Sequence, residues 1–121
     1  LIRGLAFIGL TRNLYRTPLE RIEAARAQML LTLTSRKLAK HPQAEALIKL
    51  AHNEYETLLN KIKAFSDARK QWLEASKASF IDSYDVKALR EKAESLRSAF
   101  LEQKKLWLTF NANINARIAA V

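Results

Sequence analysis

Two long stretches of the chain place apolar residues in alternating steps of four and three, and this pattern constrains the fold most. The first stretch comprises Ala51, Tyr55, Leu58, Ile62, Phe65, Arg69 and Trp72. The second stretch comprises Leu89, Ala93, Leu96, Phe100, Gln103, Trp107, Phe110 and Ile114. Such spacing forms the seam along which two helices pack in a coiled coil. Because residues 79–85 form a polar break with helix-capping side chains, the sequence predicts a long antiparallel helical hairpin.

The register of this hairpin follows from a turn midway in the polar break. It would place Phe65 opposite Phe100 and Tyr55 opposite Phe110, so that aromatic residues meet across the seam. Gln103 is a polar residue at a seam position, and such a residue can fix the register of two helices at some cost in stability. Alternatively, Gln103 faces solvent because the seam drifts around a straight helix.

A capping signal marks another helix before the hairpin. Thr17 can accept a hydrogen bond from an early backbone amide, Pro18 suits the first helical position, and Glu20 can return a bond to the cap. The pattern predicts a helix over residues 18–40. The His-Pro pair at 41–42 ends it, because a residue before proline avoids the α region.

The face that this helix should bury can be read from its larger apolar residues. These residues are Leu19, Ile22, Ala25 or Arg26, Met29 and Leu33. The run at 29–33 is apolar around most of the helix, so we expect it to be buried on more than one side.

Composition supports an all-α fold in one domain. The chain has 121 residues with only two Gly, two Pro and no Cys, which favours helix almost throughout and excludes disulfides and thiolate metal sites. The predicted fold is a coiled-coil-like antiparallel hairpin over 42–118, with the shorter helix 18–40 packed on it. An apolar, basic arm over 1–16 precedes them within the single helical domain 1–121.

Positive charge is concentrated at the start of the chain. Residues 1–40 hold eight Lys and Arg against two acids, a net charge of +6 out of +9 for the whole chain. This asymmetry predicts an anionic neighbour, which could be a lipid surface, nucleic acid or an acidic protein face; solubility alone is the other interpretation. The candidate residues for an anionic partner are Arg3, Arg12, Arg16, Arg21, Arg36, Lys37 and Lys40.

A surplus of apolar residues predicts a docking surface. A two-helix hairpin cannot bury all of them, and the surplus would favour a protein partner or a membrane surface; a self-contained bundle of three or four helices is the alternative. The first ten residues are too few to span a bilayer, which takes about 20. The candidate interface residues are Leu1, Leu5, Phe7, Ile8, Leu10, Leu30, Leu31, Leu106 and Leu108.

Signatures of catalysis or cofactor binding are missing from the sequence. It contains no Gly-rich phosphate loop and no nucleophile elbow. His52 and Glu56 are one helical turn apart, but such a pair without a second motif is a weak metal signal. We therefore expect no catalytic residues, no cofactor, no metal and no small-molecule substrate.

One short stretch has a family resemblance. Residues 25–29 (Ala-Arg-Ala-Gln-Met), followed by Leu33 and Arg36, resemble the first long helix of the LemA-like helical proteins. The resemblance ends at residue 36, and the proline-containing motif that follows a pair of arginines in that family is absent here. No site or partner is therefore carried over from the family.

These observations predict a non-catalytic structural or interaction subunit of a larger, membrane-associated protein assembly. The Arg-rich, acid-poor start is typical of mitochondrial targeting segments, so a position at the mitochondrial inner membrane is the expected setting. The alternative is a basic helical nucleic-acid-binding or ribonucleoprotein component, because Lys and Arg clusters bind phosphates.

Overall fold

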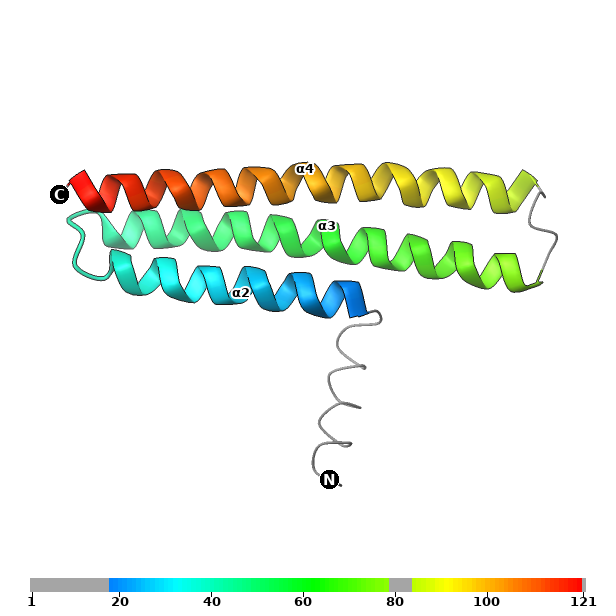
Figure 1. Ribbon diagram of the computed structural model, residues 1–121, viewed down its shortest axis with the longest axis horizontal. Coiled ribbons are helices and arrows are strands. Elements are labelled where there is room, and N and C mark those ends of the chain that lie inside the picture. Colours follow the sequence, from blue (N-terminus) through cyan, green and yellow to red (C-terminus); the bar gives the residue numbers. More distant parts are fainter. Residues whose placement is uncertain (1–17, 79–83, 121) are drawn as a thin grey trace, which may run out of the picture.

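A computed structural model describes residues 18–78 and 84–120 of the chain, and this part is almost entirely helical (Figure 1). Helix α2 spans Pro18–Leu38, α3 spans Ala44–Ala78 and α4 spans Tyr84–Ala120. The predicted all-α fold is confirmed, and each predicted helix end lies within two residues of the observed one.

The three helices run side by side, with α3 and α4 antiparallel along their whole length (Figure 1). The shorter helix α2 covers only the half of the hairpin where α3 begins and α4 ends. It runs antiparallel to α3 and in the same direction as α4. The predicted hairpin with a third helix packed on it is therefore the observed architecture.

The seam between α3 and α4 is the main core of the protein, as the heptad pattern predicted. From α3, Ala51, Leu58, Ile62 and Phe65 are buried, and from α4, Ala93, Phe100, Trp107 and Ile114 are buried. The rings of Phe65 and Phe100 stack with their centroids 6.1 Å apart. Tyr55, Trp107 and Phe110 continue the aromatic packing, with 6.2 Å between successive centroids.

Gln103 is buried in this seam rather than turned to solvent. The residue is only 8% exposed, and its amide nitrogen Nε2 donates to Oε2 of Glu54 at 3.3 Å. Of the two interpretations of this position, the buried one is correct. A buried amide with a single partner on the facing helix disfavours sliding of α4 along α3, because a shift would leave the amide unpaired.

A second buried polar link joins α2 to α4. The hydroxyl Oγ1 of Thr34 donates to Oδ1 of Asn111 at 2.5 Å, and Asn111 Nδ2 donates to the backbone oxygen of Trp107 at 2.7 Å. Thr34 and Asn111 are 1% and 2% exposed. The amide oxygen of Asn111 is thus satisfied only when Thr34 faces α4.

The predicted buried face of α2 is wrong. The buried residues of α2 are Glu20, Ala24, Ala27, Leu31, Thr34 and Leu38. Ile22, Met29 and Leu33, which were expected to be buried, are 51%, 67% and 46% exposed. The side chain of Leu19 lies outside the described part.

The reason is that α2 carries two stripes with the same spacing. The stripe of bulky residues was predicted to be buried because its apolar area is larger. The structure instead buries the stripe that contains Ala24 and Ala27, which are 2% and 3% exposed. Small side chains let two helix backbones approach closely, which the larger stripe would prevent. The run at 29–33 is consequently buried on one side only, through Leu31 and part of Leu30.

His41 shapes the connection between α2 and α3. The backbone amide of Gln43 donates to the ring nitrogen Nδ1 of His41 at 3.0 Å, and the amide of Ala44 donates to the His41 carbonyl at 3.1 Å. His41 is thus a helix-boundary residue, as predicted. Helix α3 begins at Ala44, so Pro42 is not its first residue. The predicted capping residue Thr17 lies outside the described residues.

Ile62→Ala should lower the free energy of unfolding by about 2–5 kcal/mol, because it leaves a cavity in the fully buried seam. Urea unfolding followed by circular dichroism measures this change. The control is Leu50→Ala, because Leu50 is 50% exposed; its cost should stay within about 0.5 kcal/mol. An equally small cost for Ile62→Ala would show that the seam is not the core.

Thr34→Val should lower the free energy of unfolding by about 1–3 kcal/mol, because it leaves a buried amide oxygen of Asn111 unpaired. Asn111→Leu should have a similar cost. The double variant should lose less than the sum of the two, since replacing both partners by apolar groups removes the unpaired atoms. Additive losses in urea unfolding would contradict a coupled pair.

Candidate docking surfaces

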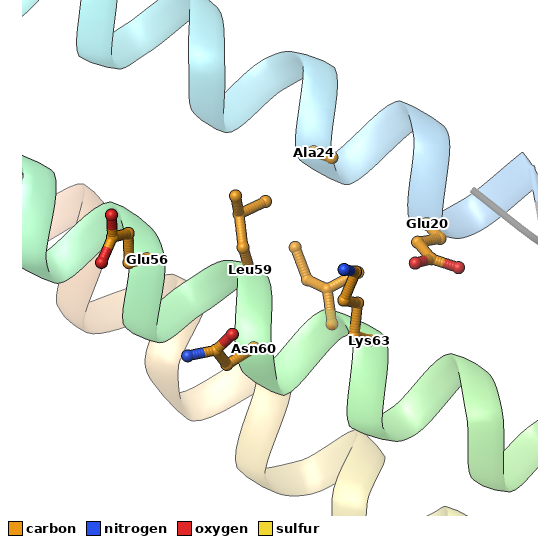
Figure 2. A pocket seen from close by; sticks show the side chains of 7 residues that line it. Glu20, Ala24, Glu56, Leu59, Asn60 and Lys63 are labelled. Carbon is orange, nitrogen blue, oxygen red and sulfur yellow. The ribbon is translucent and has the colours of Figure 1, made fainter. Parts of the chain in front are cut away.

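A small cavity lies between the first half of α2 and the middle of α3 (Figure 2). It has a volume of about 230 Å³ and is lined by Glu20, Ala24, Glu56, Leu59, Asn60, Ile62 and Lys63. Leu59 and Lys63 point from α3 toward α2, and the carboxylate of Glu20 points from α2 toward α3.

The chemistry of this cavity does not favour a catalytic or cofactor site. Its volume is below the roughly 300–1,000 Å³ of typical small-molecule pockets. It mixes carboxylates with an ammonium group, and Glu20 is 3% exposed and already has an interaction partner. The cavity is best explained as a gap left where small Ala24 faces α3.

Metal ligands do not gather in the part of the chain that the structure describes. Among residues 18–78 and 84–120, no group of three or more His, Asp or Glu could hold a metal ion. His52 and Glu56, the pair considered from the sequence, are both exposed on α3. None of the three described helices is long and apolar enough to cross a membrane.

The feature that stands out is a set of large apolar side chains exposed on well-formed helices. They are Ile22, Met29, Leu33, Leu50, Leu73, Leu101, Leu106 and Leu108. Single exposed leucines are common on protein surfaces and need no explanation. Their positions along the helices, however, gather several of them into two surfaces.

The first surface, the hairpin patch, consists of Leu50 on α3 and Leu106 on α4. Leu50 precedes Glu54 by four residues and Leu106 follows Gln103 by three, while Glu54 and Gln103 are hydrogen-bonded to each other. Because the helices are antiparallel, both leucines lie one turn beyond this pair in the same direction. Leu50 and Leu106 are 50% and 52% exposed.

The hairpin patch lies on the flank of α4 that faces away from α2. Lys104 and Asn111 mark the flank toward α2, since they contact Glu23 and Thr34 of that helix. Leu108 is one turn from each of them and therefore borders α2. Leu106 is about 200° around the helix from Leu108, so α4 exposes one leucine on each flank.

The second surface is the outer face of α2, which consists of Ile22, Arg26, Met29, Leu33 and Arg36. These residues follow one another in steps of four and three and so lie along one side of the helix. Met29, at 67%, is the most exposed of the large apolar residues described. The side chain of Arg26 is 70% exposed, and Arg36 is also exposed. The outer face is therefore an apolar stripe interrupted by two arginines.

The acidic residues of α2 are both turned away from this outer face. Glu20 is 3% exposed. The side chain of Glu23 is 12% exposed, with Oε1 3.2 Å from Nζ of Lys104 on α4 and 3.9 Å from Arg26. Because α2 contains no other acid, the charges that it exposes are all positive.

Some of the apolar interface residues predicted from the sequence are exposed in the structure and others are not. Leu106 and Leu108 are exposed, at 52% and 51%. Leu31 is 7% exposed and belongs to the core, so its prediction as an interface residue is wrong. Leu30 is partly buried against the same core. The remaining apolar candidates, Leu1, Leu5, Phe7, Ile8 and Leu10, lie outside the described residues.

The cationic candidates are mostly at the surface where the structure describes them. Arg36, Lys37 and Lys40 are exposed and Arg21 is partly buried. The others, Arg3, Arg12 and Arg16, lie outside the described residues. Arg26, which the sequence also offered as a phosphate-binding residue, was left out of these candidates because position 25 or 26 was assigned to the buried face. This arginine was the signal that this face turns outward, since an unpaired buried charge is costly.

Aromatic side chains are not available for base stacking on the described surface. Phe65, Phe100 and Trp107 are buried, and Tyr55, Trp72 and Phe110 are partly buried. Proteins that bind single strands stack bases on exposed aromatic rings.

Comparisons with known proteins do not add a family. Neither a protein-family model, nor a curated protein, nor a solved structure gives a significant match to this chain.

Proposed function

We propose that this protein is a non-catalytic structural subunit of a larger, membrane-associated assembly. The observation that carries the proposal is that two separate surfaces, the hairpin patch and the outer face of α2, hold apolar side chains exposed on regular helices. Apolar surface exposed in this way favours association with a protein or a membrane.

The core of the molecule does not need these side chains. The seam between α3 and α4 and the small-residue face of α2 form the contiguous core of Ala27, Leu31, Ala51, Leu58, Ile62, Phe65, Phe100 and Trp107. Leu50 and Leu106 remain about half exposed outside it. The paired helices α3 and α4 are suited to holding partners at fixed positions, because helices of 35 and 37 residues form a rod about 50 Å long.

The two surfaces suggest different partners. The hairpin patch is apolar and is bordered by a hydrogen-bonded Glu54–Gln103 pair, a composition that suits a protein interface with a polar rim. The outer face of α2 is cationic as well as apolar. We assign the hairpin patch to a protein subunit of the assembly.

Leu50→Lys combined with Leu106→Lys should release this protein from its assembly, because burying two ammonium groups in an apolar interface is costly. The measurement is the size of the native species after mild detergent extraction from the source cells, by native electrophoresis. The matched control is Leu73→Lys, an exposed leucine on α3 outside the hairpin patch, which should leave the size unchanged.

Two results of the same experiment would contradict the proposal. The unaltered protein could migrate as a free chain, which would exclude a stable assembly. Alternatively, nuclease treatment or raised salt could dissolve a large species, which would favour a ribonucleoprotein instead, since phosphate binding weakens steeply with salt.

A further inference from the structure

We infer that the outer face of α2 is a peripheral binding surface for anionic lipid headgroups, with Ile22, Met29 and Leu33 entering the headgroup boundary of a bilayer. This inference rests on the proposed membrane association and names the part of the molecule that meets the membrane. It is carried by the exposure of these three side chains, at 51%, 67% and 46%, and by the charges around them.

The sign of the charge selects an anionic occupant. Arg26, Arg36 and Lys37 are exposed on α2, while its two acids are turned inward, Glu23 toward Lys104 of α4. A second copy of this chain would bring the same cations face to face, and like charges repel. The chain's own first 17 residues contain three arginines and no acid, so they are also poorly matched to this face.

The order of residues along the stripe favours a lipid surface over an acidic partner helix. Arginine occupies the second and fifth of the five positions, Ile22, Arg26, Met29, Leu33 and Arg36. In a helix–helix seam, both guanidinium groups would be enclosed between the two helices. At a bilayer surface, their apolar stems can lie beside the lipid while the charged heads extend to the phosphates. Arg26 is available for this role, because its closest carboxylate oxygen is 3.9 Å away.

Among the described residues, α3 and α4 leave the outer face of α2 uncovered. Helix α2 lies at the edge of the three-helix arrangement, with α3 and α4 beyond it (Figure 1). The apolar residues from Ile22 to Leu33 extend over about 16 Å of the helix. The sequence that immediately precedes α2 has the same character, with six large apolar residues among the first ten and no acid before Glu20.

The test uses the whole chain and vesicles of phosphatidylcholine with or without phosphatidylserine. Because the chain has no cysteine, one environment-sensitive dye can be placed on Met29→Cys and, in a separate protein, on Leu50→Cys. We expect the dye at position 29 to shift to the blue on phosphatidylserine vesicles and to be quenched by spin-labelled lipid. The dye at position 50, in the hairpin patch, should do neither.

Charge and apolar contributions are separated by two double variants. Arg26→Gln with Arg36→Gln should lower the vesicle partition coefficient about 25-fold, at about fivefold for each cation near an anionic surface. Met29→Gln with Leu33→Gln should lower it by about tenfold or more through lost apolar burial. Lys87→Gln with Lys92→Gln, on exposed residues of α4, is the charge-matched control and should change it less than twofold.

Three results would overturn the inference. The protein could bind the vesicles while the dye at position 29 stays in water, which would assign binding to another part of the chain. It could fail to bind anionic vesicles at all, or an acidic peptide or RNA could shift the dye at position 29 where vesicles do not. The native assembly could survive in each case, so failure of this inference is distinct from failure of the proposed function.

Discussion

Asn111 places a polar amide in the core of this protein, where the residue is 2% exposed and lies at the contact between two helices. One end of that amide donates to the Trp107 carbonyl, and the other end accepts from Thr34. A buried amide oxygen without a partner would be costly, so α2 is held in the rotation that presents Thr34 to α4. That rotation turns Met29 and Leu33 outward, and the cationic, apolar outer face of α2 is its direct consequence.

The hairpin of α3 and α4 forms the surface against which α2 packs in this rotation. Phe65 stacks on Phe100 in the seam between α3 and α4. The part-buried hydrogen bond between Glu54 and Gln103 joins the same two helices. Apolar packing stabilises the pairing of α3 and α4, while the polar pair opposes sliding between them. Such a division is common in helical bundles, since apolar contacts alone specify register poorly.

The heptad pattern was sufficient to predict the hairpin and the pairing of Phe65 with Phe100. Tyr55, which was expected opposite Phe110, contacts the ring of Trp107 instead. Steps of four and three placed Ile62, Phe100 and Trp107 in the core, where each is at most 3% exposed. Gln103 could not be assigned from its sequence position alone, because a polar seam residue and a solvent-facing one look alike until Glu54 is seen opposite. His41 also lies at the boundary between two helices, as its position before proline predicts, although α2 already ends at Leu38.

The orientation of α2 could not be predicted in the same way. Its two stripes have identical spacing, and the apolar area of Met29 and Leu33 favoured the incorrect one. What decides between them is the shape and polarity of the facing helices, namely a close approach that Ala27 permits and the buried Asn111 that Thr34 satisfies. The close approach and the buried amide both depend on residues of α3 and α4 that are distant in sequence. The sequence of α2 alone therefore does not predict which of its stripes is buried.

The outer face of α2 depends on this rotation of the helix, and cysteine accessibility in the free, folded protein tests the rotation most directly. The chain has no cysteine of its own, so the reaction rates of Met29→Cys and Leu31→Cys with a neutral thiol reagent can be compared without background. We expect the cysteine at position 29 to react nearly as fast as in the unfolded chain and the cysteine at position 31 to be strongly protected. Protection at position 29 with rapid reaction at position 31 would show that α2 buries the opposite stripe and would contradict this rotation.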